Sequence, residues 1–503
     1  MALRTGAEYL QALRDGREVY LDGRRVKDVT TEPGLSIVAH TFAHMYDLVA
    51  QNQEAMTCLD EEGQQISGTW LQPRDRDQLG WRRRFTETIA RHTGGLFGRP
   101  QDYVPLFHLG LLDVKTDFSR GDKRFEQNIE RYWRHARDKD LMLSHGFIDV
   151  QSHPSRAINE TVVPRIVARN ADGIVVRGVK TVATFATHAD EVLIGSVPRT
   201  GLTEDHVVYF SIPIATPGLR VVARAVYGTG NAFDHPVSQY GDENDCMIIF
   251  DDVLVPWERV FSIADEKFCA TIFPRITEWA HWSILVRLAI KAEVLAGLYA
   301  LIPEMLGRAQ QPQSQEAVGE ILRYLVTLRA FIHASEDQST VTPAGHCMPN
   351  PQYVTAGRAY SVEHYRRVTG YPARHRQSGV DQHAGAGGVR QRNDRPHAGG
   401  HVRRPRRVSA RPCAHHPTGV GHGVRLLRQS SDVVRAVQRP TLDGPTRIVG
   451  RRLRLRTLPA TGARDGRNRF ARSGRRRCRQ GRPRPWPGLQ CCRPGVRRRP
   501  GGR

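Results

Sequence analysis

The chain has 503 residues and a formal net charge of +23, a balance typical of nucleic-acid-binding proteins. The charge is concentrated at one end, because residues 371–503 contain 34 Arg, 5 Asp and no Lys or Glu, which makes +29. Residues 1–370 hold 40 basic and 46 acidic side chains. This body has the mildly acidic balance of an ordinary soluble protein and gives no indication of a specific nucleic-acid partner.

Cysteine usage and hydropathy indicate a cytoplasmic protein. The body contains four cysteines that lie far apart and lack CxxC spacing, as reduced thiols do: Cys58, Cys246, Cys269 and Cys347. The N-terminus runs directly into an amphipathic helix without an apolar signal core. The most apolar run, residues 276–302, includes four charged side chains, which favours a helix buried in protein over a membrane span.

Residues 1–140 are predicted to be mainly helical. Thr5 and Glu8 have the spacing of a capping box at the start of a first helix. Residues 19–26 predict a small hairpin about the Asp22-Gly23 turn. The clearest later helix has five apolar residues on one face: Phe125, Ile129, Tyr132, Trp133 and Ala136.

Residues 141–270 change to short β-rich runs separated by turn residues, at 173–178, 192–194, 207–212 and 246–250. These runs predict a compact central domain, a β-barrel or sandwich. The helical period returns in residues 271–370, first from Trp279 to Ile302 and then from Val318 to Ile332. The order of helices, strands and helices argues against an alternating Rossmann sheet.

Several residues could carry chemistry, and each also has a structural interpretation. His145 lies where the helical pattern meets the strands, although a lone histidine is more often a satisfied core residue. His40 and His44 are a helix-spaced pair with Asp47 nearby, but the Glu of an HExxH motif is missing, so we predict no metal site. Gly228-Thr229-Gly230 lacks the third glycine of a dinucleotide loop, which argues against a nicotinamide site.

Arg99 and Tyr103, four residues apart after the flexible Gly94-Gly95 pair, could both point into one pocket. A surface Arg and a half-buried Tyr would give the same pattern. Thr184 follows the first clear strand and could donate to a cofactor ring, yet threonine in a strand is commonly only a β-former. Spacing alone leaves these alternatives open.

The body closely resembles the oxygenase component of 4-hydroxyphenylacetate 3-monooxygenase over residues 1 to about 370. The resemblance rests on short segments that occur in the same order as in the family. These segments are 4–10, Gly98-Arg99 with Asp102-Tyr103, His145 with Gln151, 183–185, 189–193, 233–236 and 250–261. The last segment, 250–261, is highly specific for the family. It implies an α+β, acyl-CoA dehydrogenase-like fold, with an N-terminal helical domain (1–140), a central β-barrel domain (141–270) and the start of a C-terminal helical bundle (271–370). It also implies a homotetramer in intact members.

The resemblance further implies that the protein uses reduced FAD (FADH2), which a separate NAD(P)H:flavin reductase supplies. In the family the reduced FAD reacts with O2 to form a C4a-hydroperoxide, and this hydroperoxide hydroxylates a phenol ortho to its hydroxyl. The family's catalytic and substrate-hydroxyl ligands fall on Arg99, Tyr103 and His145. Its flavin contacts fall on His145, Gly146, Phe147, Gln151, Ser152, His153, Pro154 and Thr184, and its substrate-tail loop includes Ser196 and Val197.

Departures from the family keep the substrate open. Residues 152–156 differ from the usual sequence after the Gln, and residues 195–198 differ from the loop that holds the acidic tail of hydroxyphenylacetate. Chlorophenols, nitrophenols and a carrier-linked tyrosine therefore stay alternatives. An acyl-CoA dehydrogenase-like flavoprotein is a second enzyme hypothesis, although no catalytic Glu stands in a matching motif.

The resemblance ends abruptly after residue 370. We interpret residues 371–503 as the product of a shifted reading frame. Within the degeneracy of the code, residues 371–383 read one base later give Ile-Leu-Arg-Asp-Ile-Gly-Ser-Gln-Gly-Leu-Ile-Asn, a family-like continuation. Residues 428–432 give Gly-Ser-Arg-Gln in the same frame. The competing hypothesis is a disordered Arg/Gly/Pro arm that binds polyanions.

Overall fold

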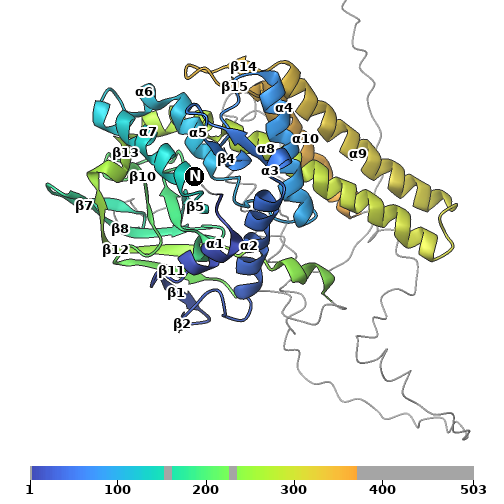
Figure 1. The fold of residues 1–503 in the computed structure, drawn as a ribbon, viewed down its shortest axis with the longest axis horizontal. Coiled ribbons are helices and arrows are strands. Elements are labelled where there is room, and N and C mark those ends of the chain that lie inside the picture. Colours follow the sequence, from blue (N-terminus) through green and yellow to red (C-terminus); the bar gives the residue numbers. More distant parts are fainter. Residues whose placement is uncertain (1–2, 152–160, 226–234, 371–503) are drawn as a thin grey trace, which may run out of the picture. The chain divides into compact units, whose positions relative to one another are not determined.

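The computed structural model describes residues 3–151, 161–225 and 235–370. The first 140 residues are mainly helical, as predicted (Figure 1). Their helices are α1 (Gly6–Ala12), α2 (Ser36–Gln51), α3 (Gln53–Met56), α4 (Arg76–His92), α5 (Pro105–Asp113), α6 (Lys115–Phe118) and α7 (Lys123–Asp138). The capping box is confirmed, because Thr5 Oγ1 accepts from the Glu8 N–H at 3.2 Å and the Glu8 carboxylate accepts from the Thr5 N–H at 2.7 Å.

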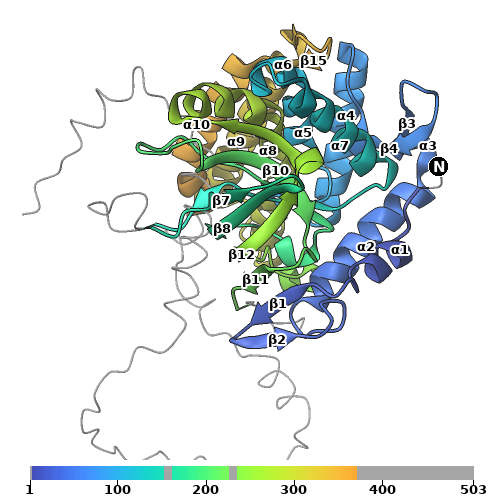
Figure 2. The ribbon, with the colours of Figure 1, turned by 90° about the vertical axis from the view of Figure 1, so that its left-hand side faces the viewer.

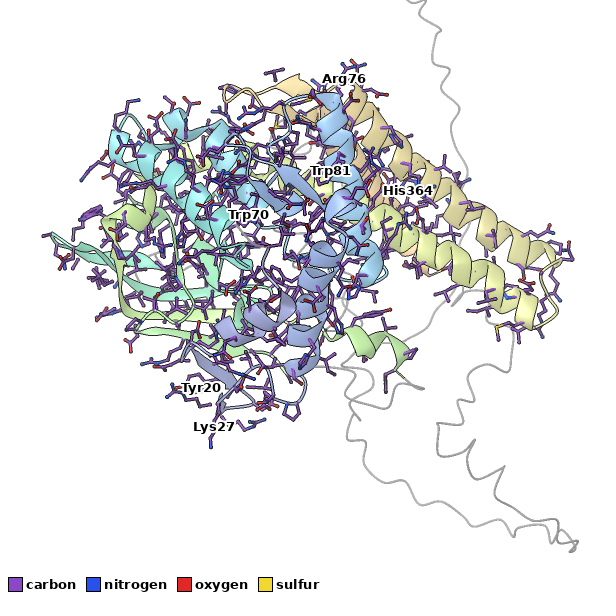
Figure 3. All side chains as sticks on the ribbon, in the orientation of Figure 1. Tyr20, Lys27, Trp70, Arg76, Trp81 and His364 are labelled. Carbon is purple, nitrogen blue, oxygen red and sulfur yellow. The ribbon has the colours of Figure 1, made fainter. Side chains whose placement is uncertain are left out.

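The predicted hairpin is also confirmed, as β1 (Glu18–Leu21) and β2 (Arg24–Val26). Asp22 and Gly23 both have positive φ, 51° and 77°, which is the backbone of a type I′ turn. Figure 3 labels Tyr20 on β1 and Lys27, which directly follows β2. β1 pairs in parallel with β11 of the central segment, so an N-terminal hairpin extends a sheet that the rest of the chain builds. The domain boundaries at 140 and 270 stay predictions.

The central segment forms two sheets. The larger one has the order β2-β1-β11-β12-β8-β6, with β7 also paired to β8, and the smaller one has the order β13-β10-β9-β5. Their strands are β5 (Leu143–Gly146), β6 (Ile148–Asp149), β7 (Arg165–Arg169), β8 (Gly173–Thr181), β9 (Glu191–Ile194), β10 (Val207–Pro213), β11 (Leu219–Ala223), β12 (Cys246–Pro256) and β13 (Val260–Ala264). A short ladder, β3 (Thr57–Leu59) with β4 (Gln65–Ser67), lies outside both sheets.

The expectation of a β-barrel for residues 141–270 is wrong. Within the described ranges each sheet keeps its own edge strands, and no hydrogen-bonded ladder joins the two sheets into a closed ring. Apolar residues from one side of each sheet instead share a core, in which the Phe210 ring of the small sheet meets the Phe250 ring of the large sheet at a centroid distance of 6.0 Å. Figure 2 shows the strands beside α1 and α2, with α4 to α7 above them. Helices α1 and α2 pack on apolar residues of the sheets. In a closed barrel those residues would face the barrel interior.

The C-terminal part consists of α8 (Glu266–Met305), α9 (Pro312–Asp337) and α10 (Pro351–Thr369), with a small ladder of β14 (Thr340–Val341) and β15 (Cys347–Met348). The helical runs predicted at 279–302 and 318–332 are confirmed. α8 and α9 run side by side as a hairpin (Figure 1). The N-terminal half of α8 is buried against α4, α5 and α10, and its two buried tryptophans, Trp279 and Trp282, anchor it there.

Candidate active site

The turn after α4 packs against helix α8 and positions Arg99 and Tyr103. Gly94 and Gly95 have φ of 60° and 71°, and a side chain on Gly95 would lie 2.7 Å from the Lys291 backbone nitrogen of α8. The following segment is fixed by Asp102, which is fully buried, forms an ion pair with Arg287 of α8 and accepts from Thr86 Oγ1 at 2.9 Å. Glycine permits the close approach and the ion pair then holds it.

Tyr103 and His145 meet although 42 positions separate them in the sequence. His145 stands on β5, opposite Leu193 of β9, and its ring stacks on Phe147 with centroids 5.1 Å apart and planes 12° apart. Tyr103 lies 5.9 Å from the same imidazole, and the Arg99 guanidinium carbon lies 5.8 Å from the Tyr103 ring centroid. The three residues predicted to hold a phenol hydroxyl therefore form one cluster.

This cluster contains polar atoms that are buried without a partner. Both ring nitrogens of His145 and the Nε of Arg99 have no hydrogen-bond partner, and the two residues are only 6% and 5% exposed. Burial, assisted by the Arg99 charge, lowers the pKa of His145 to about 3. The imidazole is neutral at pH 7, with one nitrogen able to donate and the other able to accept. Orphaned polar atoms of this kind indicate a polar ligand.

Glu243, in the loop before β12, is the carboxylate that faces Arg99. Its Oε1 lies 3.6 Å from Arg99 Nη1 and accepts from the Gly98 N–H at 3.0 Å. Desolvation raises the pKa of Glu243, and the Arg99 charge opposes that shift. The Arg99 charge is thus partly balanced while no substrate is bound.

Thr184 lies directly behind the His145 strand. Its backbone carbonyl accepts from Ser144 Oγ at 2.8 Å, and its hydroxyl donates to Asp245 Oδ1 at 2.7 Å. Phe185, the next residue, has a left-handed backbone with φ of 61°. A non-glycine residue in this region indicates a turn imposed by its surroundings.

The remaining predicted contacts divide into three groups. Gly146 and Phe147 are buried beside His145, and a side chain on Gly146 would lie 2.9 Å from Ile194 Cδ1. Gln151 is exposed, and Ser152, His153 and Pro154 lie outside the described residues. Ser196 donates its hydroxyl to the His206 carbonyl at 2.8 Å, and the partly buried Val197 packs against the core. In this arrangement the Ser196 hydroxyl is engaged within the protein.

The structure adds residues that the sequence analysis missed. Arg358 of α10 is buried, donates to His281 Nδ1 of α8 at 2.9 Å, and has its pKa lowered to about 10 by burial, a shift that the nearby Tyr103 opposes. Glu243 and Asp245 touch Arg99 and Thr184. The acidic run 242–245 just before a strand was a signal that could have drawn attention to the last two.

No metal ligands or membrane spans emerge in the parts of the chain that the structure describes. His44 packs edge-on against His92, and Asp47 accepts from the Gly6 N–H at 2.8 Å. No three His, Cys, Asp or Glu side chains in these parts converge as metal ligands do. The helices in the same parts are too short or too polar to span a bilayer.

Two family models cover nearly all of the described chain. Residues 5–262 match the N-terminal domain of 4-hydroxyphenylacetate 3-hydroxylase and residues 269–371 match its C-terminal domain. The chain belongs to the 4-hydroxyphenylacetate 3-hydroxylase family. Its predicted acyl-CoA dehydrogenase-like fold is confirmed, apart from the barrel.

Curated relatives of this family act on different phenols. A 4-nitrophenol 4-monooxygenase/4-nitrocatechol 2-monooxygenase oxygenase component from Rhodococcus opacus is 36% identical over 377 residues, which is 72% of this chain and 71% of the relative. The 4-hydroxyphenylacetate 3-monooxygenase oxygenase component of Thermus thermophilus is 33% identical over 73% of this chain and 77% of its own. A Streptomyces globisporus monooxygenase that acts on a substrate linked to a peptidyl-carrier protein is 32% identical, over 72% of this chain and 71% of the relative.

Solved structures of the family agree with the fold. The oxygenase component of 4-hydroxyphenylacetate 3-monooxygenase complexed with FAD matches with a TM-score of 0.69 and 30% identity, over 77% of this chain and 83% of that chain. A 4-hydroxybutyryl-CoA dehydratase matches with a TM-score of 0.67 at 19% identity, which is a likeness of fold alone. The second family model ends at residue 371.

Proposed function

We propose that this chain is the oxygenase component of a two-component, FAD-dependent monooxygenase that hydroxylates a phenol ortho to its hydroxyl. The observation that carries the proposal is the buried cluster of Arg99, Tyr103 and His145, with unpartnered nitrogens on Arg99 and His145. The donor set fits a phenol hydroxyl. The flavin would be held by His145, Gly146, Phe147 and Thr184. When bound, reduced FAD would supply the chemistry that activates O2.

The residues of the cluster would make the phenol electron-rich. A phenol has a pKa of about 10, and lowering it to about 7 requires roughly 4 kcal/mol of preferential phenolate stabilisation. Hydrogen bonds to charged groups contribute about 1.5 to 3 kcal/mol each, so Arg99 together with His145 could supply it. The neutral imidazole of His145 would accept the phenol proton, and the phenolate would then offset the Arg99 charge that disfavours protonated His145.

Catechol formation tests the proposal. Purified protein, FAD, NADH, an added flavin reductase and a phenol should consume O2 and release the ortho-diol, and 18O2 should label one hydroxyl. His145→Ala should abolish the product, and flavin binding measured on the same variant separates a loss of chemistry from a loss of cofactor. His333→Ala, on the exposed face of α9, is the matched histidine control and should change nothing. Unchanged turnover in His145→Ala would refute the assigned role.

The substrate is proposed as a class. 4-Hydroxyphenylacetate, nitrophenols, chlorophenols and a carrier-linked tyrosine all stay candidates, since relatives at similar identity act on different ones of these groups. A panel of four such phenols, ranked by kcat/KM, would separate them. We further propose a separate reductase, a homotetramer for the intact family chain and a cytoplasmic location.

The tail is proposed to come from a shifted frame. The support is the abrupt end of family similarity near residue 371 together with the Lys-free and Glu-free composition that follows. Nucleotide sequencing across codon 370 should show one base lost or gained. An intact frame, with the same tail in independent relatives, would favour the polyanion-binding arm.

A further inference from the structure

Arg358 of α10 is a buried cation without a counterion. It is 8% exposed, and in the described ranges no Asp or Glu forms an ion pair with its guanidinium. A guanidinium stays charged in proteins and has five N–H groups, of which one donates here to His281 Nδ1 at 2.9 Å. Because a buried charge without a partner is costly, the remaining N–H groups need an explanation.

The acids of the neighbouring segments are engaged elsewhere. Asp102 pairs with Arg287 of α8, and Glu336 of α9 pairs with Arg83 of α4 at 3.0 Å. Both carboxylates are thus neutralised by other guanidinium groups. Within the part of the chain that the structure describes, the charge of Arg358 is left unbalanced.

Arg82 is a second buried guanidinium that forms no ion pair with a described residue, and it is satisfied in another way. It is 1% exposed and donates to the carbonyls of Gly68 and Leu71 at 2.7 and 3.1 Å. Arg358 has only the imidazole of His281, which is neutral because burial, assisted by the Arg358 charge, holds its pKa well below the usual value. Arg358 therefore retains donors for an anion from outside the described chain.

Arg358 borders the cluster proposed to hold the phenol, and Tyr103 is the shared neighbour. The guanidinium carbon of Arg287 lies 6.0 Å from the Tyr103 ring centroid, and His281, the partner of Arg358, stands less than two turns earlier on the same helix. Tyr103 also acts electrostatically on Arg358. On its other side the Arg99 guanidinium carbon lies 5.8 Å from the Tyr103 ring centroid. A ring bound at the cluster therefore has Arg358 nearby.

We propose that Arg358 is a specificity-determining residue that binds a planar two-oxygen group on the substrate ring, a carboxylate or a nitro group. The guanidinium fork matches such a group with two parallel hydrogen bonds. The inference rests on the proposed function and narrows its substrate class. A carboxylate carries a full charge, and 4-nitrophenolate delocalises its charge onto the nitro oxygens. A chlorine atom is a poor acceptor and the amine of a carrier-linked tyrosine is a cation, so Arg358 disfavours both.

A matched pair of ligands tests the inference. 4-Hydroxyphenylacetate and 4-hydroxyphenylacetamide have nearly the same shape and differ by one charge, and calorimetry on the full chain gives the Kd of each. Wild type should bind the acid at least about tenfold more tightly than the amide. Arg358→Met should weaken acid binding by about tenfold or more and leave amide binding within about twofold. Arg358→Lys, which keeps the charge without the fork, should retain part of the preference.

Arg308→Met is the matched control, because Arg308 is exposed in the turn between α8 and α9. It should leave both Kd values unchanged. A preference for the acid that persists in Arg358→Met overturns the inference, and the proposed function stands if that variant still hydroxylates a phenol. Failure of wild type to bind and hydroxylate any phenol overturns the proposed function.

A measurement on wild type alone covers the case in which Arg358→Met does not fold. 4-Nitrophenolate should bind about three- to tenfold more tightly than 4-cyanophenolate, since a nitrile has one acceptor atom and cannot engage both prongs of the fork. Equal Kd values within either pair of ligands overturn the inference. That result is expected if a carboxylate of the protein itself already occupies Arg358.

Discussion

Glu243 Oε1 lies 3.6 Å from Arg99 Nη1, and the Gly98 N–H holds the same carboxylate oxygen at 3.0 Å. The Arg99 side chain is only 6% exposed, and an unbalanced guanidinium at such burial would be costly. The distance is long for an ion pair, so Arg99 keeps hydrogen-bonding capacity for another anion. Glu243 has the position of a counterion with which a phenolate must compete.

Replacing Glu243 with Gln should therefore tighten phenolate binding. The amide keeps an acceptor for the Gly98 N–H and removes the competing charge. We expect the affinity for the phenolate of 4-nitrophenol to rise about two- to fivefold, and the pKa of the bound phenol to fall. Both quantities can be read from the visible absorbance of the phenolate during a pH titration.

Asp242→Asn controls for that experiment, because Asp242 pairs with Arg224 and not with Arg99. The Asp242→Asn variant should bind the phenolate of 4-nitrophenol with the same affinity as wild type. Weaker phenolate binding in Glu243→Gln would show that Glu243 orients Arg99 and does not compete with the substrate.

His108 should make the fold sensitive to acid. Its Nε2 is buried without a partner, and burial lowers its pKa to about 3. An unfolded histidine titrates near 6.5, so between pH 6.5 and 3 the unfolded state binds more protons and stability falls with pH by up to about 1.4 kcal/mol per unit. His108→Phe should retain stability at pH 7 and exceed wild type by up to about 2 kcal/mol at pH 5, measured by urea unfolding.

His188→Phe is the contrasting variant, since burial lowers the pKa of His188 as well, to about 4. Its Nε2 contacts the Leu35 carbonyl at 2.9 Å and its Nδ1 contacts Thr187 Oγ1 at 2.8 Å. Removing these hydrogen bonds should destabilise the protein at pH 7. Equal effects of the two substitutions at pH 7 would contradict the assignment of His108 Nε2 as an unpartnered atom.

Local patterns predicted local structure well. The Thr5–Glu8 box and the Asp22-Gly23 turn depend on backbone groups within a few residues, and both formed as predicted. Family motifs placed Arg99, Tyr103 and His145 in one site, and the structure brings them together. Their roles toward substrate and flavin stay predictions.

Long-range pairing could not be read from the chain. Whether strands close into a barrel depends on which edges meet, and the parallel pairing of β1 with β11 joins residues some 200 positions apart, which no local period specifies. The partners of Thr184 and Arg99 were hidden for the same reason. Asp245 and Glu243 reach the site only because the loop before β12 folds back beside the Thr184 turn.

Lys180 of β8 and Asp149 of β6 form a buried ion pair, in which Lys180 Nζ lies 2.6 Å from Asp149 Oδ1. Both residues are less than a tenth exposed. Lys180→Met leaves the carboxylate buried and unpaired, which should cost about 3 to 5 kcal/mol. The double change Lys180→Met with Asp149→Leu should cost much less, since no charge is left behind. Thermal and urea unfolding of these two variants and of the single Asp149→Leu variant measure the coupling, and additive losses would show that the pair is not coupled.

The far end of the α8–α9 hairpin exposes an apolar face. Its members are between 43% and 77% exposed: Leu298, Leu301, Ile302, Met305, Leu306, Leu322 and Val326. Apolar patches of this kind mark interaction surfaces or aggregation sites. The frameshift hypothesis predicts that helices encoded beyond codon 370 would cover this face in an intact family chain.

The chain as written should therefore bind the dye 1-anilinonaphthalene-8-sulfonate strongly and aggregate readily. Leu301→Lys with Val326→Lys should lower the dye fluorescence and raise the soluble yield, because the two changes interrupt the patch on both helices. Gln315→Lys, at an exposed polar position of α9, adds the same kind of charge without removing apolar surface and should have little effect. A gene with the frame restored after codon 370 should give a chain with low dye fluorescence and no benefit from the lysine pair. Strong dye binding by that restored chain would mean that the missing segment packs elsewhere.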